Sequence, residues 1–290
     1  MLKREATDML HQETTTFHGA HGLRLSADRR ELPGSERGTV LLLHGGGQTR
    51  HSWARTARSL AEDGWQTWTI DTRGHGDSEW SPDGRYTLDD FTADLYAIVA
   101  QLDTKPVVVG ASLGGRTALA AEGERPGTLA GLVLVDITHR TEQSGQSRVK
   151  RFMTGAPHGF ATLEEAADAI SAYRPGRPRP RSLDGLKRNL RRREDGRWYW
   201  HWDPQFLGST ADAGYYSPER LRRAARGIAI PTLLVRGLHS DIVTAESAAE
   251  FLDLVPTARE VGVAAGHMIT GDDNDVFTSH LREFLTTDVS

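Results

Sequence analysis

The stretch that decides the fold is Val107–Gly114, which reads Val-Val-Val-Gly-Ala-Ser-Leu-Gly. A run of β-branched residues ends in a Gly-x-Ser-x-Gly turn, and an alanine-rich segment of helical character follows. A strand, this turn and a helix in succession form a nucleophile elbow, which holds its serine in a strained and exposed conformation. Small residues are needed there because two chain segments pass too close for larger side chains. The pattern predicts that the hydroxyl of Ser112 attacks an acyl carbon.

Apolar runs on both sides of the elbow alternate with amphipathic segments. One of these segments begins at Thr87, where Thr87 and Asp90 resemble a capping box at the start of a helix. Strands that are apolar throughout and separated by helices indicate a parallel sheet covered on both faces. A more polar stretch over 14–32 is expected to add an antiparallel hairpin at the sheet edge. We therefore predict an α/β fold with a mostly parallel, doubly wound sheet of about eight strands. The predicted buried strands span 39–43, 65–70, 107–109, 132–135, 232–235 and about 259–263.

The alternation of strands and helices is interrupted between His139 and about Tyr216. We interpret this block as a helical cap inserted over the carboxyl edge of the sheet. The interpretation divides the chain into a first core part at 1–138, a cap at 139–216 and a second core part at 217–290. Within the cap we expect a capped helix over 162–173, a proline-rich stop at 175–180, a further helix over 182–193 and an aromatic cluster at 198–202.

The residues that suit acyl transfer follow the predicted strands. In a doubly wound sheet, ligands bind beyond the carboxyl ends of the strands. Ser112 ends one strand, Asp241 follows the strand over 232–235, and His267 follows the last strand. Their order along the chain, Ser, Asp, His, is the order expected for a catalytic triad in such a fold. In addition, His44–Gly47 (His-Gly-Gly-Gly) matches a loop whose backbone N–H groups face a developing oxyanion.

Together these residues resemble the α/β-hydrolase superfamily over nearly the whole chain. The segment 71–78, Asp-Thr-Arg-Gly-His-Gly-Asp-Ser, adds to the resemblance, because Asp-x-Arg-Gly-x-Gly-x-Ser after the fourth strand is common in that superfamily. The Gly-x-Ser-x-Gly-Gly elbow and the long cap are similar to the branch of cofactor-free haloperoxidases, esterases and C–C hydrolases. Epoxide hydrolases and haloalkane dehalogenases carry Asp in place of Ser112, which disfavours those activities.

The resemblance implies a serine hydrolase that cleaves a carboxylic ester, lactone or related acyl bond through an acyl-enzyme. Ser112 would attack, His267 would carry the proton, and Asp241 would orient the imidazole. Some members of the superfamily place the acid after the preceding strand, so Asp136 is the alternative acid. The same triad supports perhydrolysis or C–C cleavage of a β-diketone, which are the alternative activities. A non-catalytic ligand receptor on the same fold is a further alternative, and an intact triad counts against it.

Other parts of the site are expected from the same pattern. The backbone N–H groups of Leu113 and Gly46 are predicted to form the oxyanion hole. Trp200, Trp202 and His44 are candidates for the substrate pocket. The competing interpretations are that the two tryptophans form the core of the cap and that His44 is a structural hydrogen-bonding residue.

Charge in the cap is uneven. Between residues 145 and 202 the chain carries 13 Lys and Arg against 6 Asp and Glu. This excess would attract an anionic substrate or partner, unless the charges only solvate a helix face.

Composition sets the remaining limits. A net charge of −4 over 290 residues gives no reason to expect nucleic-acid binding. The chain has no cysteine, which excludes thiol catalysis and disulfides. No His-x-His or His-Glu-x-x-His spacing is present, so we expect no metal, and triad chemistry needs no cofactor. The mixed charge of residues 1–8 and the lack of a long apolar run predict a cytoplasmic protein without a membrane partner. The sequence does not specify the oligomeric state.

Overall fold

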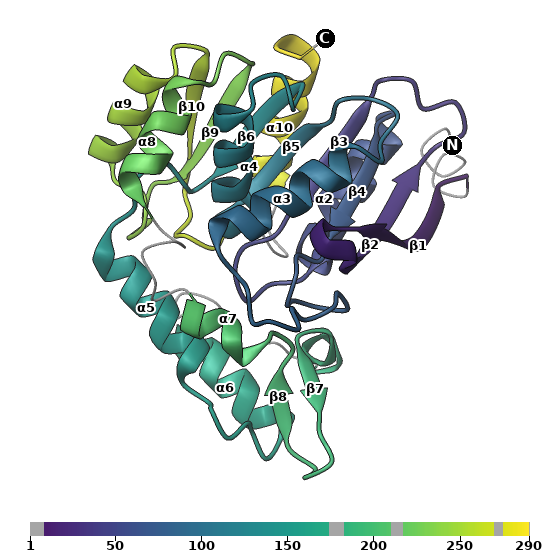
Figure 1. Ribbon diagram of the computed structural model, residues 1–290, viewed down its shortest axis with the longest axis vertical. Helices are drawn as coiled ribbons and strands as arrows, with labels where there is room; N and C mark the ends of the chain where they lie inside the picture. Colours follow the sequence, from purple (N-terminus) through teal and green to yellow (C-terminus); the bar gives the residue numbers. More distant parts are fainter. Residues whose placement is uncertain (1–8, 174–182, 210–216, 270–274, 290) are drawn as a thin grey trace.

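A computed structural model describes residues 9–173, 183–209, 217–269 and 275–289 of the chain. Its centre is an eight-stranded sheet (Figure 1). The strands, named in the order in which they lie side by side, are β1 (His11–His18), β2 (Arg24–Glu31), β4 (Gln66–Ile70), β3 (Thr39–Leu43), β5 (Val107–Ala111), β6 (Gly131–Val135), β9 (Thr232–Gly237) and β10 (Ala258–Val263). In this spatial order each strand from β4 to β10 runs parallel to the next, whereas β1 pairs with β2 and β2 with β4 in antiparallel fashion. The predicted α/β fold is confirmed, including the hairpin at the edge.

Helices cover both faces of the sheet. Every residue of β3, β5 and β6 is buried, because these central strands are packed on both sides. The predicted capping box is present, since the Thr87 hydroxyl accepts from the N–H of Asp90 (3.3 Å) and the Asp90 carboxylate accepts from the N–H of Thr87 (2.9 Å). None of the helices in the described ranges has the length and apolar character needed to cross a membrane. One face carries α3 (Leu88–Val99), α4 (Leu113–Glu124), α8 (Pro218–Arg226) and α9 (Ala245–Leu254), and the other carries α2 (Ala54–Glu62) and α10 (Asp275–Thr287).

The segment between β6 and α8 forms a separate lobe at one end of the sheet, at the bottom of Figure 1. The capped helix predicted over 162–173 is present as α6 (Leu163–Tyr173), and its start is fixed where Thr162 Oγ1 accepts from the N–H of Glu165 (3.2 Å). The proline-rich stop at 175–180 and the predicted end of the cap at Tyr216 lie outside the described residues. The domain boundaries therefore stay a prediction. The lobe contains α5 (Gln143–Thr154), α6 (Leu163–Tyr173), the short 3-10 turn η3 (Asp184–Arg188), β7 (Leu190–Arg192), β8 (Trp198–Trp200) and α7 (Pro204–Ser209).

The helix predicted over 182–193 is wrong. The chain there forms η3 and then β7, which pairs with β8 in an antiparallel hairpin. The hairpin turns at Gly196, whose φ of +78° suits glycine, and the N–H of Arg193 bonds to the carbonyl of Arg197 (3.0 Å). Leu190 lies opposite Trp200, so pairing buries an aliphatic side chain against an aromatic one. Tertiary packing on the aromatic cluster therefore overrides the helical tendency of the basic residues.

The hairpin end of the lobe docks on the loop over 71–78 that follows β4. The Arg191 guanidinium donates to the Asp77 carboxylate (2.7 Å) and to the carbonyl of Gly76 (2.9 Å). The buried His201, just after β8, accepts a hydrogen bond from the N–H of Gly76 on its Nδ1 atom (2.7 Å). The lobe is thus attached to the core at its hairpin as well as where the chain enters and leaves it.

Candidate active site

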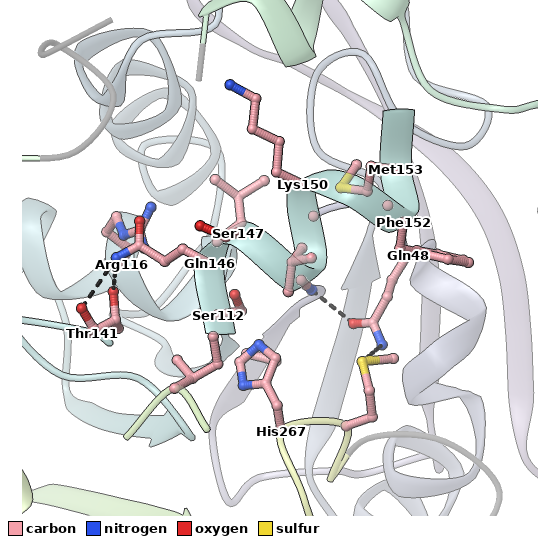
Figure 2. Close-up of a pocket in the computed structure, with 18 of the residues that line it drawn as sticks. Gln48, Ser112, Arg116, Thr141, Gln146, Ser147, Lys150, Phe152, Met153 and His267 are labelled. Atoms are coloured by element: carbon pink, nitrogen blue, oxygen red, sulfur yellow. Dashed lines mark hydrogen bonds between the residues drawn. The ribbon is translucent and has the colours of Figure 1, made fainter. Parts of the chain in front are cut away.

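A cavity of about 330 Å³ lies between the carboxyl edge of the sheet and the cap lobe (Figure 2). Ser112, His267 and the glycine loop over 45–47 line its core side. Helix α5 lines the cap side with Gln146, Ser147, Lys150, Phe152 and Met153. The structure therefore brings the predicted nucleophile and base to one pocket.

Ser112 sits in the turn that the sequence predicts. Its backbone has φ 44° and ψ −105°, a conformation that costs a non-glycine residue about 1–3 kcal/mol. Close packing enforces the turn: a Cβ atom on Gly110 would lie 2.4 Å from the backbone nitrogen of Gly115, and one on Gly114 would lie 2.5 Å from the carbonyl oxygen of Leu43. The strand-turn-helix geometry thus exposes the Ser112 side chain at the edge of the sheet.

His267 is hydrogen-bonded to Asp136, not to Asp241. Its Nδ1 lies 2.7 Å from Oδ2 of Asp136, whose carboxylate is completely buried. The same carboxylate accepts from the N–H of Gly237 (2.9 Å) and from the hydroxyl of Ser240. Since the proton on Nδ1 is directed at the carboxylate, Nε2 is left unprotonated and able to accept a proton.

The structure contradicts the prediction that Asp241 orients His267. Both oxygens of the Asp241 carboxylate accept from the Arg148 guanidinium of α5, at 2.7 Å each. These hydrogen bonds hold the pKa of Asp241 below its usual value. Asp136 reaches the histidine instead because its positive φ of 49° turns the side chain across the end of the neighbouring strand β9. Aspartate is one of the residues that tolerate this left-handed conformation.

Leu113 and Gly46, whose N–H groups are predicted to form the oxyanion hole, both line the cavity. Leu113 is the first residue of α4, and Gly46 lies in the loop after β3. Within the described ranges neither N–H donates to a protein acceptor. The imidazole of His44 accepts from the N–H of Thr72 on Nε2 (3.0 Å), so its Nδ1–H donates to the carbonyl of Gly45 (2.8 Å). Because the C=O and N–H of one trans peptide point in opposite directions, holding the Gly45 carbonyl fixes the direction of the Gly46 N–H.

Three buried histidines lie together behind this loop. The ring centroids of His44 and His75 are 5.2 Å apart, and those of His75 and His201 are 5.8 Å apart. Burial lowers the pKa of His44 to about 4 and that of His75 to about 3, and it holds the pKa of His201 well below its ordinary value. All three are therefore neutral near pH 7, which is the form their acceptor and donor roles require.

The residues suggested for the substrate pocket are not among the described residues that line the cavity. Trp200 and Trp202 stack with ring centroids 4.9 Å apart and belong to the core of the cap lobe. His44 is fully buried behind the glycine loop. The suggestion is therefore wrong for all three, because pairing of β8 with β7 directs Trp200 into the lobe and hydrogen bonding occupies both nitrogens of His44.

Sequence reasoning missed the helix that forms the cap side of the cavity. Val149, Phe152 and Met153 occur at helical spacing within α5, a periodicity that signals the helix. Several of the basic cap residues have partners within the described ranges, among them Arg148 with Asp241 and Lys187 with Asp184. Lys150 lines the cavity itself.

No cluster of three or more His, Cys, Asp or Glu side chains suited to a metal ion occurs in the part of the chain that the structure describes. Hydrogen bonds orient the imidazole of His267 and the loop beside it. The arrangement offers a hydroxyl nucleophile, a base hydrogen-bonded to a buried carboxylate and two cavity-lining residues, Leu113 and Gly46, as candidate N–H donors. This is the set of groups required for acyl transfer.

Comparisons with known proteins show that the chain is similar to hydrolases. Residues 38–273 match the family model described as the alpha/beta hydrolase fold. Esterase Rv0045c of Mycobacterium tuberculosis is 28% identical over 261 residues, which cover 86% of this chain and 83% of the relative. A solved structure of that esterase superposes with a TM-score of 0.76 and 26% identity over 99% of this chain and 98% of the other. The structure of E-2-(acetamidomethylene)succinate hydrolase has the same fold, with a TM-score of 0.82 and 21% identity over 96% of this chain and 100% of the other.

Proposed function

The chain belongs to the alpha/beta hydrolase family, and on that premise we propose that this hydrolase cleaves carboxylic esters through an acyl-enzyme on Ser112. The observation that carries the proposal is the hydrogen bond between His267 and the buried Asp136 at a cavity that Ser112 also lines. The three side chains supply a nucleophile, a base and an orienting acid. A small-molecule ester or lactone is the substrate class that suits a cavity of this size.

Acylation begins when the Ser112 hydroxyl attacks the carbonyl carbon of the ester. Nε2 of His267 takes the hydroxyl proton and then delivers it to the leaving alcohol. Asp136 keeps the imidazole in the productive tautomer and stabilises its charged form. The N–H groups of Leu113 and Gly46 stabilise the oxyanion, and each such donor contributes about 3 kcal/mol in the transition state. Water then repeats the sequence on the acyl-enzyme and releases the acid.

Substitution of the nucleophile tests the proposal. Ser112→Ala should lower the turnover of p-nitrophenyl acetate and butyrate by about 10⁶-fold, because removal of a triad serine has a cost of that order. A fluorophosphonate should label Ser112 alone in the native chain, as mass spectrometry of the peptides would reveal. Thermal unfolding of the variant serves as the control for folding. Hydrolysis by purified Ser112→Ala at a wild-type rate would refute the serine mechanism.

Perhydrolysis and C–C cleavage use the same three side chains, so a substrate panel must separate them from ester hydrolysis. We expect turnover of simple esters and lactones to exceed both the cleavage of β-diketones and the peroxide-dependent halogenation of monochlorodimedone. Support for the ester comes from the 28% identical relative that is named an esterase. A larger kcat/KM for a β-diketone than for any ester would reassign the reaction.

A further inference from the structure

Arg148 joins three parts of the candidate site. It belongs to α5, and its Nε and Nη2 atoms each donate to the Asp241 carboxylate at 2.7 Å. Its Nη1 atom donates to the carbonyl of Tyr173 (3.4 Å), and its guanidinium lies 4.9 Å from the centre of the Tyr173 ring. Tyr173 ends α6 and lines the cavity. One side chain therefore connects two cap helices to the loop that follows β9.

The start of α5 also rests directly on that loop. A Cβ atom on Gly145 would lie 2.3 Å from the carbonyl oxygen of Asp241, so only glycine permits this approach. The N–H of Glu142, just before the helix, donates to the carbonyl of Ile242 (3.0 Å). The ion pair is thus the side-chain part of a continuous contact between the cap and the core.

The loop reaches the catalytic residues from its other side. The hydroxyl of Ser240 donates to the carboxylate of Asp136, the residue that holds His267. Ser240 and Asp241 are adjacent, so one residue of the loop contacts the triad acid and the next contacts the cap helix. Any displacement of α5 relative to Asp241 is therefore a displacement relative to the triad.

The face of α5 that this contact fixes is a wall of the cavity. Figure 2 shows the helix crossing above Ser112 and His267, with Gln146, Ser147 and Lys150 along it. We propose that Arg148 and Asp241 act as positioning residues, a latch that sets how far the α5 wall stands from the triad and so which acyl chains fit. The proposal rests on the proposed esterase function, and it gives Asp241 a role other than that of the triad acid.

The test compares Arg148→Gln and Asp241→Asn over p-nitrophenyl esters from acetate to octanoate, with kcat and KM determined separately. We expect both variants to leave kcat for acetate within about threefold. The two variants should shift the preferred chain length, the one with the highest kcat/KM, in the same direction as each other. For the longer esters KM should change by three- to tenfold. The double variant should match the more affected single variant, because either change alone releases the latch.

Arg140→Gln is the matched control. Arg140 also forms a bidentate ion pair, with Glu250 of α9 (2.9 and 3.0 Å), near the start of the cap. It is not among the described residues that line the cavity. The control should keep the wild-type chain-length profile. Profiles that coincide for Arg148→Gln and Arg140→Gln would overturn the latch, as would a loss of about 10³-fold in kcat for acetate in Asp241→Asn alone.

Hydrogen exchange separates failure of the latch from failure of the esterase proposal. In Arg148→Gln the amides of 143–154 should exchange at least about threefold faster than in Arg140→Gln, whether or not any ester is a substrate. If the wild type hydrolyses no ester and the exchange still differs, the esterase function fails while α5 remains held by Arg148. If exchange in 143–154 is the same in both variants, the latch fails even where ester hydrolysis is observed.

Discussion

Substitution of Asp136 by Asn tests the assignment of the triad most directly. The carboxylate accepts three hydrogen bonds, from Gly237, Ser240 and His267. An amide has the same shape, so its oxygen keeps the bond from the Gly237 N–H and its NH₂ group takes the place of Oδ2. The Ser240 hydroxyl then loses its acceptor, because its oxygen already accepts from the N–H groups of Ile242 (3.0 Å) and Val243 (3.3 Å). The imidazole faces that NH₂ group as well. His267 must then accept on Nδ1 and carry its proton on Nε2, where it can no longer accept the proton of Ser112.

The expected loss follows from this change of tautomer. We expect kcat for p-nitrophenyl butyrate to fall by about 10⁴-fold, equivalent to about 5.4 kcal/mol of transition-state stabilisation. The free energy of unfolding should fall by about 1–3 kcal/mol, because the Ser240 hydroxyl loses the acceptor that it has in the wild type. Assays of p-nitrophenol release at pH 7 and 8 measure kcat, and urea unfolding measures the free energy of unfolding.

Asp241→Asn provides the matched comparison for this experiment, because it removes a carboxylate of the same kind from a neighbouring loop. We expect its kcat for p-nitrophenyl butyrate to remain within about threefold of wild type, the reverse of the ranking that the sequence suggests. If Asp136→Asn retains more than a tenth of wild-type kcat while folded, the geometry of His267 described above does not govern the reaction. An equal loss in both variants would refute the distinction between them.

Three further outcomes are expected from features away from the triad. Burial lowers the pKa of His44 to about 4 and that of His75 to about 3, so below about pH 6.5 the unfolded chain binds more protons than the folded chain. The free energy of unfolding should therefore fall as the pH drops from 6.5 toward 4, by up to about 1.4 kcal/mol per pH unit for each histidine. Urea titrations that give a constant free energy of unfolding over this range would contradict the burial argument. Trp200→Ala should lower the free energy of unfolding by about 3–5 kcal/mol without changing the preferred ester chain length, because the ring lies in the cap core. An altered chain-length preference with normal stability would show instead that Trp200 contributes to the substrate pocket. Excess EDTA should leave ester hydrolysis within about twofold, since the triad carries out both proton transfers itself; a loss restored by zinc would argue for a metal.

The core of the fold was predictable because its signals are local. Val107–Gly114 places a buried strand, a glycine turn and a helix within a few residues, and the apolar runs elsewhere repeat the same alternation. The capping box at Thr87 and the serine and histidine of the site were predicted in the same way. Each of these depends on residues close together in the chain, where steric limits and periodicity determine the structure.

The structure of the cap and the identity of the triad acid were not predictable from local sequence signals. Asp136 and Asp241 both follow strands, and the difference between them lies in Arg148, which is 93 residues from Asp241 in the sequence. The hairpin over 190–200 likewise depends on how Trp200 packs in the lobe, which overrides the propensity of the basic segment before it. Such choices are decided by contacts between distant segments, and a single sequence carries no direct record of those contacts.

The docking of the hairpin on the loop over 71–78 bears on how this protein can be recombined with its relatives. Exchange of the cap alone would remove Arg191 and His201, and with them the partner of the Gly76 N–H and one partner of the Asp77 carboxylate, which would keep Arg50 of the core. Chimeras with a foreign cap should therefore be soluble only when the 71–78 loop is exchanged along with it. The unit that must be exchanged is discontinuous, since it joins a loop of the core to a hairpin more than a hundred residues downstream.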